Sequence, residues 1–414
     1  MALYKTLVKK VSISPKKKTK QKDYLPKGQL PIIDQGQQLI GGYSDNPDLQ
    51  LSCNLPVIVF GDHTRAVKYV DFPFGAGADG IKVLEPAEGI YPKFLYYATQ
   101  YLVLRLEDKG YARHYQYIEK KGLDIPSIPE QKRIVARIEE MFSELDNGVE
   151  TLRKTKQQLA VYRQAVLKKA FEGAYTKQWR KDNQYITPLD DFNAIKKWNP
   201  IYKDTSGDET EIHLALPKSW LKIRMGDVFE VEVGATPSRR IAEYWDGDIA
   251  WVSSGEVHFN TIFETDECIT QDGLDHASTN VQPVGTIMLA MIGEGKTRGQ
   301  AAILNLPAAH NQNTAAILVS KTPCQPKYIY YFLQMNYDHT RRVGSGNNQK
   351  ALNKERVRAL RFPFASFAEQ TVIVQEIEAR LSACDNIEKT VDTALQQAEA
   401  MRQSILKQAF EGKL

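Results

Sequence analysis

The sequence has few of the features that indicate a secreted, membrane-bound or metal-dependent protein. No apolar run approaches the ~20 residues that cross a bilayer, and the first residues, MALYK, lack the apolar core of a signal peptide. The four cysteines lie far apart without a Cys-x-x-Cys pair, and the seven histidines form no His-x-x-x-His pair. This pattern is typical of reduced thiols and argues against a structural zinc. We therefore predict a cytoplasmic protein with no membrane segment and no metal site.

Positive charge is unevenly distributed along the chain. The formal net charge is only +4, yet nine lysines and a single acid lie between Lys5 and Lys27. Such a run is either a solvated face or a contact for a polyanion, and the sequence leaves both interpretations open.

One long segment of the chain occurs twice. SIPEQ at residues 127–131 begins the first copy and AFEG at 170–173 ends it, whereas SFAEQ at 366–370 and AFEG at 409–412 delimit the second. The offset is 239 at both ends (366 − 127 and 412 − 173), so no insertion separates the copies. An ungapped repeat of this length indicates a duplicated architecture.

Each copy has the pattern of a long coiled-coil helix. A Ser-x-x-Glu capping box opens it at Ser127 or Ser366, and Gly173 or Gly412 stands where a left-handed C-cap is expected. Apolar residues recur every seven positions between these ends, which is typical of a coiled coil. These positions are Ile138, Leu145, Leu152, Leu159 and Val166, and then Ile377, Cys384, Val391, Ala398 and Ile405. We expect the stripe to be widened by Ile134, Met141, Phe142, Val149, Tyr162, Leu381, Ile387, Leu395 and Met401.

Two globular segments alternate with the two helices, because 414 residues are too many for one hydrophobic core. PKFLYY at 92–97 matches PKYIYY at 326–331, and PKGQLPII at 26–33 resembles WDGDIAWV at 245–252. We predict globular domains at 1–127 and 211–366, helices at 128–173 and 367–414, and a polar linker with some local helix at 174–210. The second helix must run back along the first to bury its stripe. This predicts an antiparallel pair with one globule at each end, related by a pseudo-two-fold axis.

Polar and basic residues in the loops of both globules are the candidate DNA-binding residues. Arginine and lysine bind phosphate or the guanine edge, and asparagine or glutamine pairs with adenine. In the first globule they are Lys16, Lys17, Lys18, Arg65, Lys68, Arg113, His114, Tyr115 and Lys120. In the second they are Arg239, Arg240, Lys296, Arg298, Arg341, Arg342, Ser345, Asn347, Asn348 and Lys350. Any one of them is more often a solvated surface residue, but two such loops just before two matching helices favour binding.

Two glycine-rich segments match nucleotide-binding loops only loosely. AMIGEGKT at 290–297 fits the phosphate-loop pattern, but residues 301–307 have a strand pattern, whereas a phosphate loop opens a helix. We expect a hairpin that presents Lys296 and Arg298. GAGADG at 75–80 fits Gly-x-Gly-x-x-Gly, but residues 81–86 are too few for a crossover helix, so we expect a turn. We predict a non-catalytic chain with no cofactor of its own.

The order of globule, helix, globule and helix resembles the specificity subunit of a type I restriction–modification enzyme over nearly the whole chain. The resemblance is carried by the two hexapeptides, by Glu-Gln at 130–131 and 369–370, by AFEG at both helix ends, and by LPKSW and MGDV at 216–220 and 225–228. It implies an α+β fold, with two globular α/β target recognition domains separated by two long antiparallel coiled-coil helices. Each domain would bind one block of a bipartite double-stranded DNA target. The implied partners are two methylation subunits and, for cleavage, restriction subunits, which carry S-adenosylmethionine, ATP and magnesium.

Two hypotheses from other functional classes remain open. A coiled-coil scaffold with two peptide-binding heads would bind partners with little dependence on salt, whereas phosphate contacts give steep salt dependence. A nucleotide hydrolase acting through Lys296 would show ATP turnover that Lys296→Ala abolishes.

Overall fold

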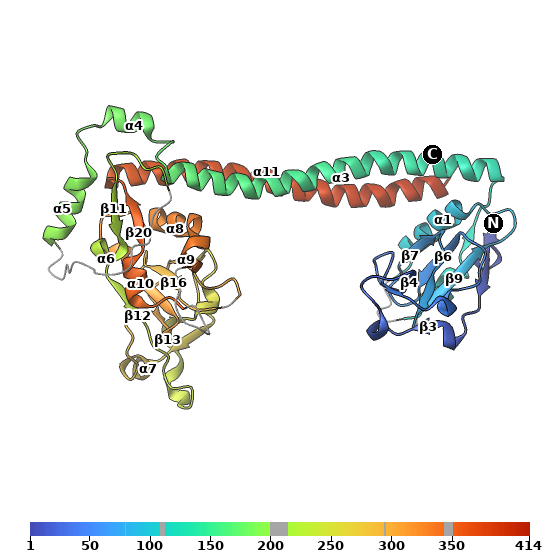
Figure 1. The fold of residues 1–414 in the computed structure, drawn as a ribbon, viewed down its shortest axis with the longest axis horizontal. Coiled ribbons are helices and arrows are strands. Elements are labelled where there is room, and N and C mark those ends of the chain that lie inside the picture. Colours follow the sequence, from blue (N-terminus) through green and yellow to red (C-terminus); the bar gives the residue numbers. More distant parts are fainter. Residues whose placement is uncertain (79, 108–111, 199–213, 294, 343–350) are drawn as a thin grey trace. The chain divides into compact units, whose positions relative to one another are not determined.

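The chain divides into two compact units (Figure 1). The computed structural model describes residues 1–78, 80–107, 112–198, 214–293, 295–342 and 351–414. Unit 1 comprises Met1–Lys156 and Lys389–Leu414, and unit 2 comprises Gln157–Glu388. We call the part of unit 1 outside the long helices head 1, and the corresponding part of unit 2 head 2.

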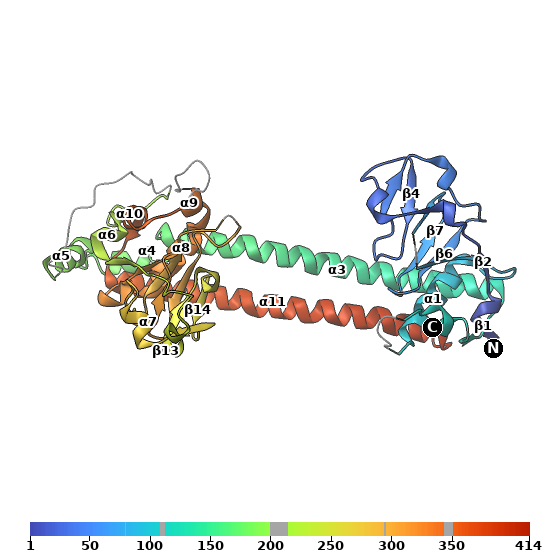
Figure 2. The same cartoon turned by 90° about the horizontal axis from the view of Figure 1, so that it is seen from below.

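The two long helices predicted from the repeat are α3 (Ile128–Phe171) and α11 (Phe367–Phe410). Within each unit they lie side by side and run in opposite directions (Figures 1 and 2). Ion pairs between them are Asp146–Arg402 and Lys156–Asp392 in unit 1, and Arg163–Asp385 and Arg163–Glu388 in unit 2. The residue number on α11 falls as the number on α3 rises. The predicted antiparallel pairing is therefore confirmed.

The seam between α3 and α11 is formed by the predicted heptad residues. Those that are buried are Ile138, Leu159, Val166, Ile377, Cys384, Val391, Ala398 and Ile405. Three of the companion residues are instead exposed, Tyr162 at 50%, Ile387 at 47% and Met401 at 56%, so the prediction of a wider stripe was wrong at these positions. Two paired helices bury only a narrow seam along their a and d positions.

The ends of the long helices follow the glycine prediction but not the whole capping-box prediction. Gly173 and Gly412 have φ of 70° and 72°, the left-handed C-cap that glycine adopts without strain. The Ser366 hydroxyl accepts from the Glu369 backbone N–H at 3.3 Å. The Glu369 carboxylate, however, binds side chains of other segments, and Glu130 pairs with its own neighbour on α3. The predicted return bond of the glutamates was therefore wrong.

In the part that the structure describes, head 1 contains two four-stranded sheets and one two-stranded sheet. The first, antiparallel throughout, is formed in spatial order by β2 (Val8–Val11), β9 (Ile81–Pro86), β6 (Val57–Gly61) and β7 (Val67–Val70). The second is formed by β3 (Lys18–Thr19), β8 (Gly75–Gly77), β4 (Leu30–Ile33) and β5 (Gly42–Ser44), and β1 (Ala2–Leu3) pairs with β10 (Gly122–Leu123). The helices are α1 (Pro92–Leu104) and α2 (Tyr115–Ile118), with short 3-10 helices η1 (Tyr4–Thr6), η2 (Pro15–Lys17), η3 (Gln21–Asp23) and η4 (Pro47–Leu49). Residues 75–77 were predicted as part of a turn, but they pair as strand β8.

Head 2 repeats this arrangement with additions. Its first sheet is formed by β12 (Val231–Val233), β19 (Thr314–Ile317), β16 (Ile287–Ala290), β17 (Ala301–Leu304) and β14 (Asn260–Ile262). The second is formed by β15 (Glu267–Ile269), β13 (Trp245–Val252) and β18 (Ala309–His310), and β11 (Leu221–Arg224) pairs with β20 (Arg361–Phe364). The α-helices are α4 (Lys177–Asp182), α5 (Pro188–Trp198), α6 (Met225–Val228), α7 (Gln271–Asp275), α8 (Pro326–Met335), α9 (Tyr337–Arg342) and α10 (Lys354–Ala359). The 3-10 helices are η5 (Ala242–Tyr244), η6 (Ser254–Glu256) and η7 (Val319–Lys321).

The two heads share a strand order. The order β2-β9-β6-β7 in head 1 corresponds to β12-β19-β16-β17 in head 2, and α1 and α8 pack on the equivalent strands. In the smaller sheets, β4 pairs in parallel with β8 as β13 does with β18. The match seen in sequence between residues 26–33 and 245–252 therefore reflects equivalent strands.

The central strand of each first sheet is buried on both faces. Residues 58 and 60 of β6 belong to the cluster beneath α1, and residues 57 and 59 belong to the cluster on the opposite face. Residues 287 and 289 of β16 likewise belong to one hydrophobic cluster, and residues 288 and 290 belong to another on the opposite face. Successive side chains of a strand point to opposite faces, so a continuous apolar run suits a strand that is covered on both sides.

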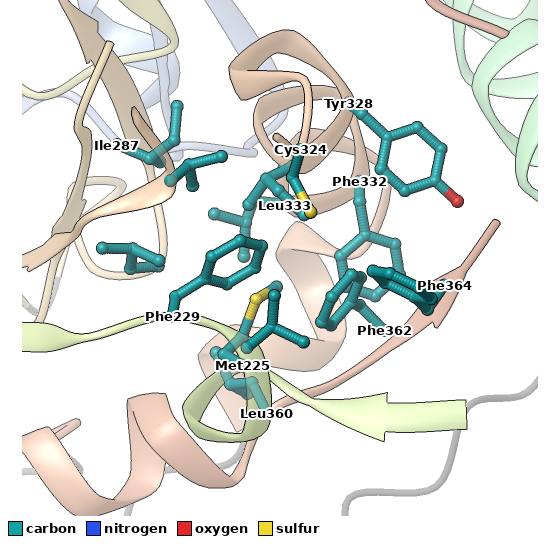
Figure 3. Packing of buried hydrophobic residues seen from close by; sticks show 14 of the residues in the cluster. Met225, Phe229, Ile287, Cys324, Tyr328, Phe332, Leu333, Leu360, Phe362 and Phe364 are labelled. Carbon is teal, nitrogen blue, oxygen red and sulfur yellow. The ribbon is translucent and has the colours of Figure 1, made fainter. Parts of the chain in front are cut away.

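The main core of unit 2 also includes part of the predicted linker. Figure 3 shows Phe229, Phe332 and Phe362 meeting between the sheet, α8 and β20. Phe192 and Ile195 of α5, which lie in the predicted 174–210 linker, join the same cluster. At least this part of the segment belongs to head 2. Within the described ranges, no helix has the length and apolarity needed to cross a membrane.

Candidate nucleic-acid interface

In head 2, the hairpin between β16 and β17 is joined to helix α9. The Tyr337 hydroxyl donates to the Lys296 carbonyl, and Arg341 Nη1 donates to the same hydroxyl at 2.7 Å. Gly299, at φ +85°, allows the close approach, since a Cβ there would lie 3.2 Å from Arg341 Cγ. Lys296 is exposed and Arg298 partly exposed. The structure thus brings together candidates from two separate stretches of sequence.

Arg298 has an unusual environment within this hairpin. Its Nε is buried and has no hydrogen-bond partner in the described structure. A buried donor without an acceptor is costly, so such a group is often completed by a ligand or water. The strand β17 follows the hairpin directly, which confirms the expected hairpin and excludes the helix that a phosphate loop requires.

In head 1, the equivalent hairpin between β6 and β7 is joined to the segment before α2. The Asp62 carbonyl accepts from the His114 backbone N–H at 2.8 Å, and Asp62 Oδ1 accepts from the Tyr115 N–H at 2.9 Å. Arg65 lies at the turn with φ of 60° and is partly exposed, and Arg113 is exposed on the joined segment. In both heads, therefore, a basic hairpin is hydrogen-bonded to the segment that follows α1 in head 1 or α8 in head 2.

Three predicted DNA-binding residues of head 1 are buried, which argues against direct contacts with DNA. Lys68 is 5% exposed, and its Nζ donates to the Asp34 carbonyl at 2.8 Å. Burial lowers the pKa of Lys68, and the nearby Asp34 carboxylate opposes that shift. His114 is 1% exposed with Nδ1 3.0 Å from the Asp62 carbonyl, and burial raises the pKa of Tyr115 to about 12. These side chains stabilise the hairpin and its neighbours.

The other basic candidates of head 1 lie on separate segments. Lys16 is exposed on η2, and Lys17 donates to the Gln50 carbonyl at 2.7 Å. Lys18 is partly exposed on β3, so this cluster belongs to the second sheet rather than to the hairpin. Lys120 is exposed just after α2, whereas Arg113 lies just before this helix. The nine candidates of head 1 thus do not form one patch.

Arg239 and Arg240 lie beside the second sheet of head 2. The Arg239 guanidinium lies 3.7 Å from the Trp245 ring centroid and pairs bidentately with Glu267. The hydrogen bonds that Arg239 donates to Glu267 raise the pKa of Arg239 and lower that of the Glu267 carboxyl. Arg240 is exposed. Sequence reasoning missed the contacts that Trp245 and Glu267 make with Arg239.

The remaining candidates of head 2 lie at the end of α9 or after it. Arg342 is exposed at the end of this helix. Ser345, Asn347, Asn348 and Lys350 lie outside the described residues. In the described ranges, no group of three or more His, Cys, Asp or Glu residues is arranged to hold a metal ion.

Comparison with known proteins supports the resemblance found in the sequence. Residues 217–397 match the family model of the type I restriction modification DNA specificity domain. The specificity subunit of the Escherichia coli type I restriction enzyme EcoR124I/EcoR124II is 22% identical over 370 residues, which cover 87% of this chain and 81% of that subunit.

Solved structures share the fold. A chain from a structural study of complex assembly and conformational transition of the type I R-M system superimposes with a TM-score of 0.65 at 13% identity, and the match covers 100% of this chain and 97% of that chain. The HsdS subunit from Thermoanaerobacter tengcongensis gives a TM-score of 0.54 at 13% identity, covering 100% and 96%. The repeated helices, the two heads of equivalent topology and the match of residues 217–397 to the specificity-domain model make this chain similar to the specificity subunits of type I restriction–modification enzymes.

Proposed function

We propose that this chain is the sequence-specific DNA-binding subunit of a type I restriction–modification complex, and that each head binds one block of a bipartite target. The observation that carries the proposal is the duplication itself. Two heads with the same strand order pack on the two long helices, one on the start of α3 and the end of α11, the other on the end of α3 and the start of α11. Paired recognition elements on a repeated scaffold suit a target made of two separated blocks.

The joined hairpins are the proposed DNA-contacting edges. In head 2 the edge comprises Lys296, Arg298 and Arg341, and in head 1 it comprises Arg65 and Arg113. A protein that contacts DNA places cations against phosphates and a few donors against base edges. Arg298 is partly exposed on this hairpin, so its guanidinium is the candidate for a base contact in head 2.

The exposed apolar residues of the long helices are the proposed docking sites for two methylation subunits. Tyr162 and Met401 occupy equivalent positions of the repeat, at the offset of 239, and are 50% and 56% exposed. Val161, beside Tyr162, is 71% exposed. Large apolar side chains exposed in this way mark interaction surfaces more often than single scattered ones do. Two equivalent sites would accept two copies of one partner.

The chemistry of the complex would reside in its other subunits. The methylation subunits would bind S-adenosylmethionine, and the restriction subunits would use ATP and magnesium, whereas this chain would choose the site. We propose that the complex acts in the cytoplasm, as the sequence predicts for this chain. The domain limits proposed from the sequence, 1–127 and 211–366, are then the two target recognition domains, with head 2 extended to include α5.

Random-site selection on DNA tests the proposal. The full chain, bound to its methylation subunits, should select two conserved blocks separated by a spacer of constant length. Its affinity should fall steeply with salt, because each phosphate contact releases counterions. A single contiguous site, or binding that is insensitive to salt, would contradict the proposal.

A further inference from the structure

A buried glutamine joins head 1 to helix α3. Gln131 is 0% exposed and lies one turn inside the helix. Its Oε1 accepts from the Tyr91 backbone N–H at 2.7 Å, and its Nε2 donates to the carbonyls of Gly89 and Pro126 at 3.0 and 2.9 Å. One amide thus connects the β9–α1 loop, the N-terminus of α1 and the segment that leads into α3.

The equivalent glutamine makes equivalent bonds in unit 2. Gln370, at the offset of 239, is also 0% exposed. Its Oε1 accepts from the Gln325 backbone N–H at 3.2 Å, its Nε2 donates to the Ala365 carbonyl at 2.9 Å, and Cys324 Sγ lies 3.9 Å from Nε2. Gln325 precedes α8 as Tyr91 precedes α1, so the same junction is built twice.

Only an amide satisfies this junction. The site needs an acceptor for the first N–H of a helix, which has no partner inside the helix, and a donor for the carbonyls opposite. Glutamine supplies both from one planar group. Glutamate has the same shape, but its ionised carboxylate would place negative charge against the carbonyl of Pro126 or Ala365.

In each unit, an ion pair nearer the surface also links the head to the long helix. Lys93 Nζ is 2.7 Å from Glu139 in unit 1, and Lys327 pairs with Glu378 in unit 2. Both lysines are the second residue of the hexapeptide that opens α1 or α8, and both glutamates lie eight residues after the glutamine. Each head is therefore held to its own long helix by one buried amide and one partly exposed ion pair.

We propose that Gln131 and Gln370 are positioning residues that fix the angle of each head on its long helices and thereby restrict the spacer length that the protein accepts. This inference rests on the proposed function. Helix α1 packs on β6 and β7, the strands that carry the hairpin, and α8 packs on β16 and β17. A head that rotates about its junction moves its hairpin along and around the DNA. A firmly held head thus accepts one spacer, and a loosely held head accepts several.

The test measures affinity against spacer length. The full chain with its methylation subunits is titrated against duplexes that carry both selected blocks and spacers from two base pairs shorter to two longer than the selected one. Gln131→Leu and Gln370→Leu keep the size of the side chain but remove its polar atoms. Each should lower the preference for the selected spacer over its neighbours about fivefold or more, the lower end of measured couplings between sites. The bases selected in each block should stay unchanged.

Controls separate positioning from a loss of folded protein. Gln158→Leu changes an exposed glutamine of the same helix and should leave the spacer profile unchanged. A smaller active fraction would lower binding to every duplex equally, so an unaltered preference in both variants overturns the inference. If either variant does not fold, Lys93→Met and Lys327→Met loosen the same junctions from the surface, and an unaltered preference in these variants overturns it as well. Failure of the unmodified protein to select two blocks would instead refute the proposed function, and this inference with it.

Discussion

The two units of the repeat use the same residues at the junction between head and helix, but they use the preceding residue differently. Glu130 of unit 1 is on the surface and pairs with Arg133 of its own helix. Its counterpart Glu369 is 2% exposed and accepts from Thr176, from Arg180 and from the Trp220 indole. The difference arises because the chain leaving α3 folds over the start of α11 in unit 2. Residues that fix the junction are repeated, whereas residues that meet unrepeated segments have diverged in role.

The ends of the long helices show the same contrast. Phe171 is fully buried and packs on Tyr328 and Phe332, with ring centroids 5.1 and 5.5 Å away. The equivalent Phe410 is only partly buried against Phe94 and Tyr101. All five tryptophans lie between residues 179 and 251, inside unit 2. Tryptophan fluorescence therefore reports unit 2 alone, and the two units can be compared within one protein.

The largest expected difference is that between Phe171→Ala and Phe410→Ala. Removing a fully buried aromatic ring leaves a cavity, so Phe171→Ala should destabilise unit 2 by about 3–5 kcal/mol. Phe410→Ala removes a partly buried ring and should cost unit 1 about 2 kcal/mol. In urea titrations, the tryptophan transition should move only for Phe171→Ala, while far-UV circular dichroism should detect both. Equal shifts of the tryptophan transition would contradict the division into two units.

The glutamate pair should show the next largest difference. Glu369→Gln leaves Arg180 without a counter-charge in a mostly buried site, and breaking such a pair should destabilise unit 2 by about 3 kcal/mol. Trp220 fluorescence should also change, because its indole N–H donates to Glu369 at 2.8 Å. Glu130→Gln, the matched control, should leave the unfolding curve unchanged. A loss of stability in both variants would show that the two glutamates have one role.

A smaller effect is expected from acid on unit 2. His310 is 0% exposed, and burial lowers the pKa of its imidazole to about 4. In the unfolded chain the imidazole has an ordinary pKa of about 6.5, so between about pH 6.5 and about pH 4 it is protonated while the folded imidazole stays neutral. The free energy of unfolding therefore falls as the pH drops from about 6.5 to about 4. The loss at pH 5 should be about 2 kcal/mol, measured as the shift of the tryptophan transition between pH 7 and pH 5.

The matched variant for this effect is His310→Gln, which cannot take up a proton in this range. Its stability should depend less on pH than that of the unmodified chain, by the same amount. The Glu232 carboxylate, which faces the imidazole and raises its pKa, should be left in place. Parallel pH profiles for the two proteins would show that other groups cause the acid sensitivity.

The duplicated features of the fold could be predicted from the sequence because they depend on local periodicity. The heptads and the offset of 239 predicted both long helices, and the chain order predicted their antiparallel pairing. The match between 26–33 and 245–252 identified equivalent strands although only a few residues agree. In each case the pattern repeats a physical requirement, such as an apolar seam or an alternating strand, which is visible within a short window.

The candidate site was less predictable because exposure depends on distant partners. Lys68 is buried against Asp34, which is 34 residues away in sequence and follows β4 of the other sheet, and no local pattern indicates this pairing. The exposure of Tyr162 and Met401 depends on how narrow the seam between two helices is. The link between Lys296 and Tyr337 likewise joins segments about forty residues apart. Sequence reasoning found basic loops, but it could not tell which basic residues reach the surface.

The proposed function implies that the length of the paired helices determines the spacer between the two blocks of the DNA target. The direct measurement is random-site selection with a chain that lacks one heptad from each helix, residues 151–157 and 390–396, which keeps the seam in phase. Seven residues of helix span about 10 Å, or about three base pairs at 3.4 Å each. We expect both selected blocks to keep their bases while the spacer shortens by that amount. A spacer of unchanged length between intact blocks would contradict the account.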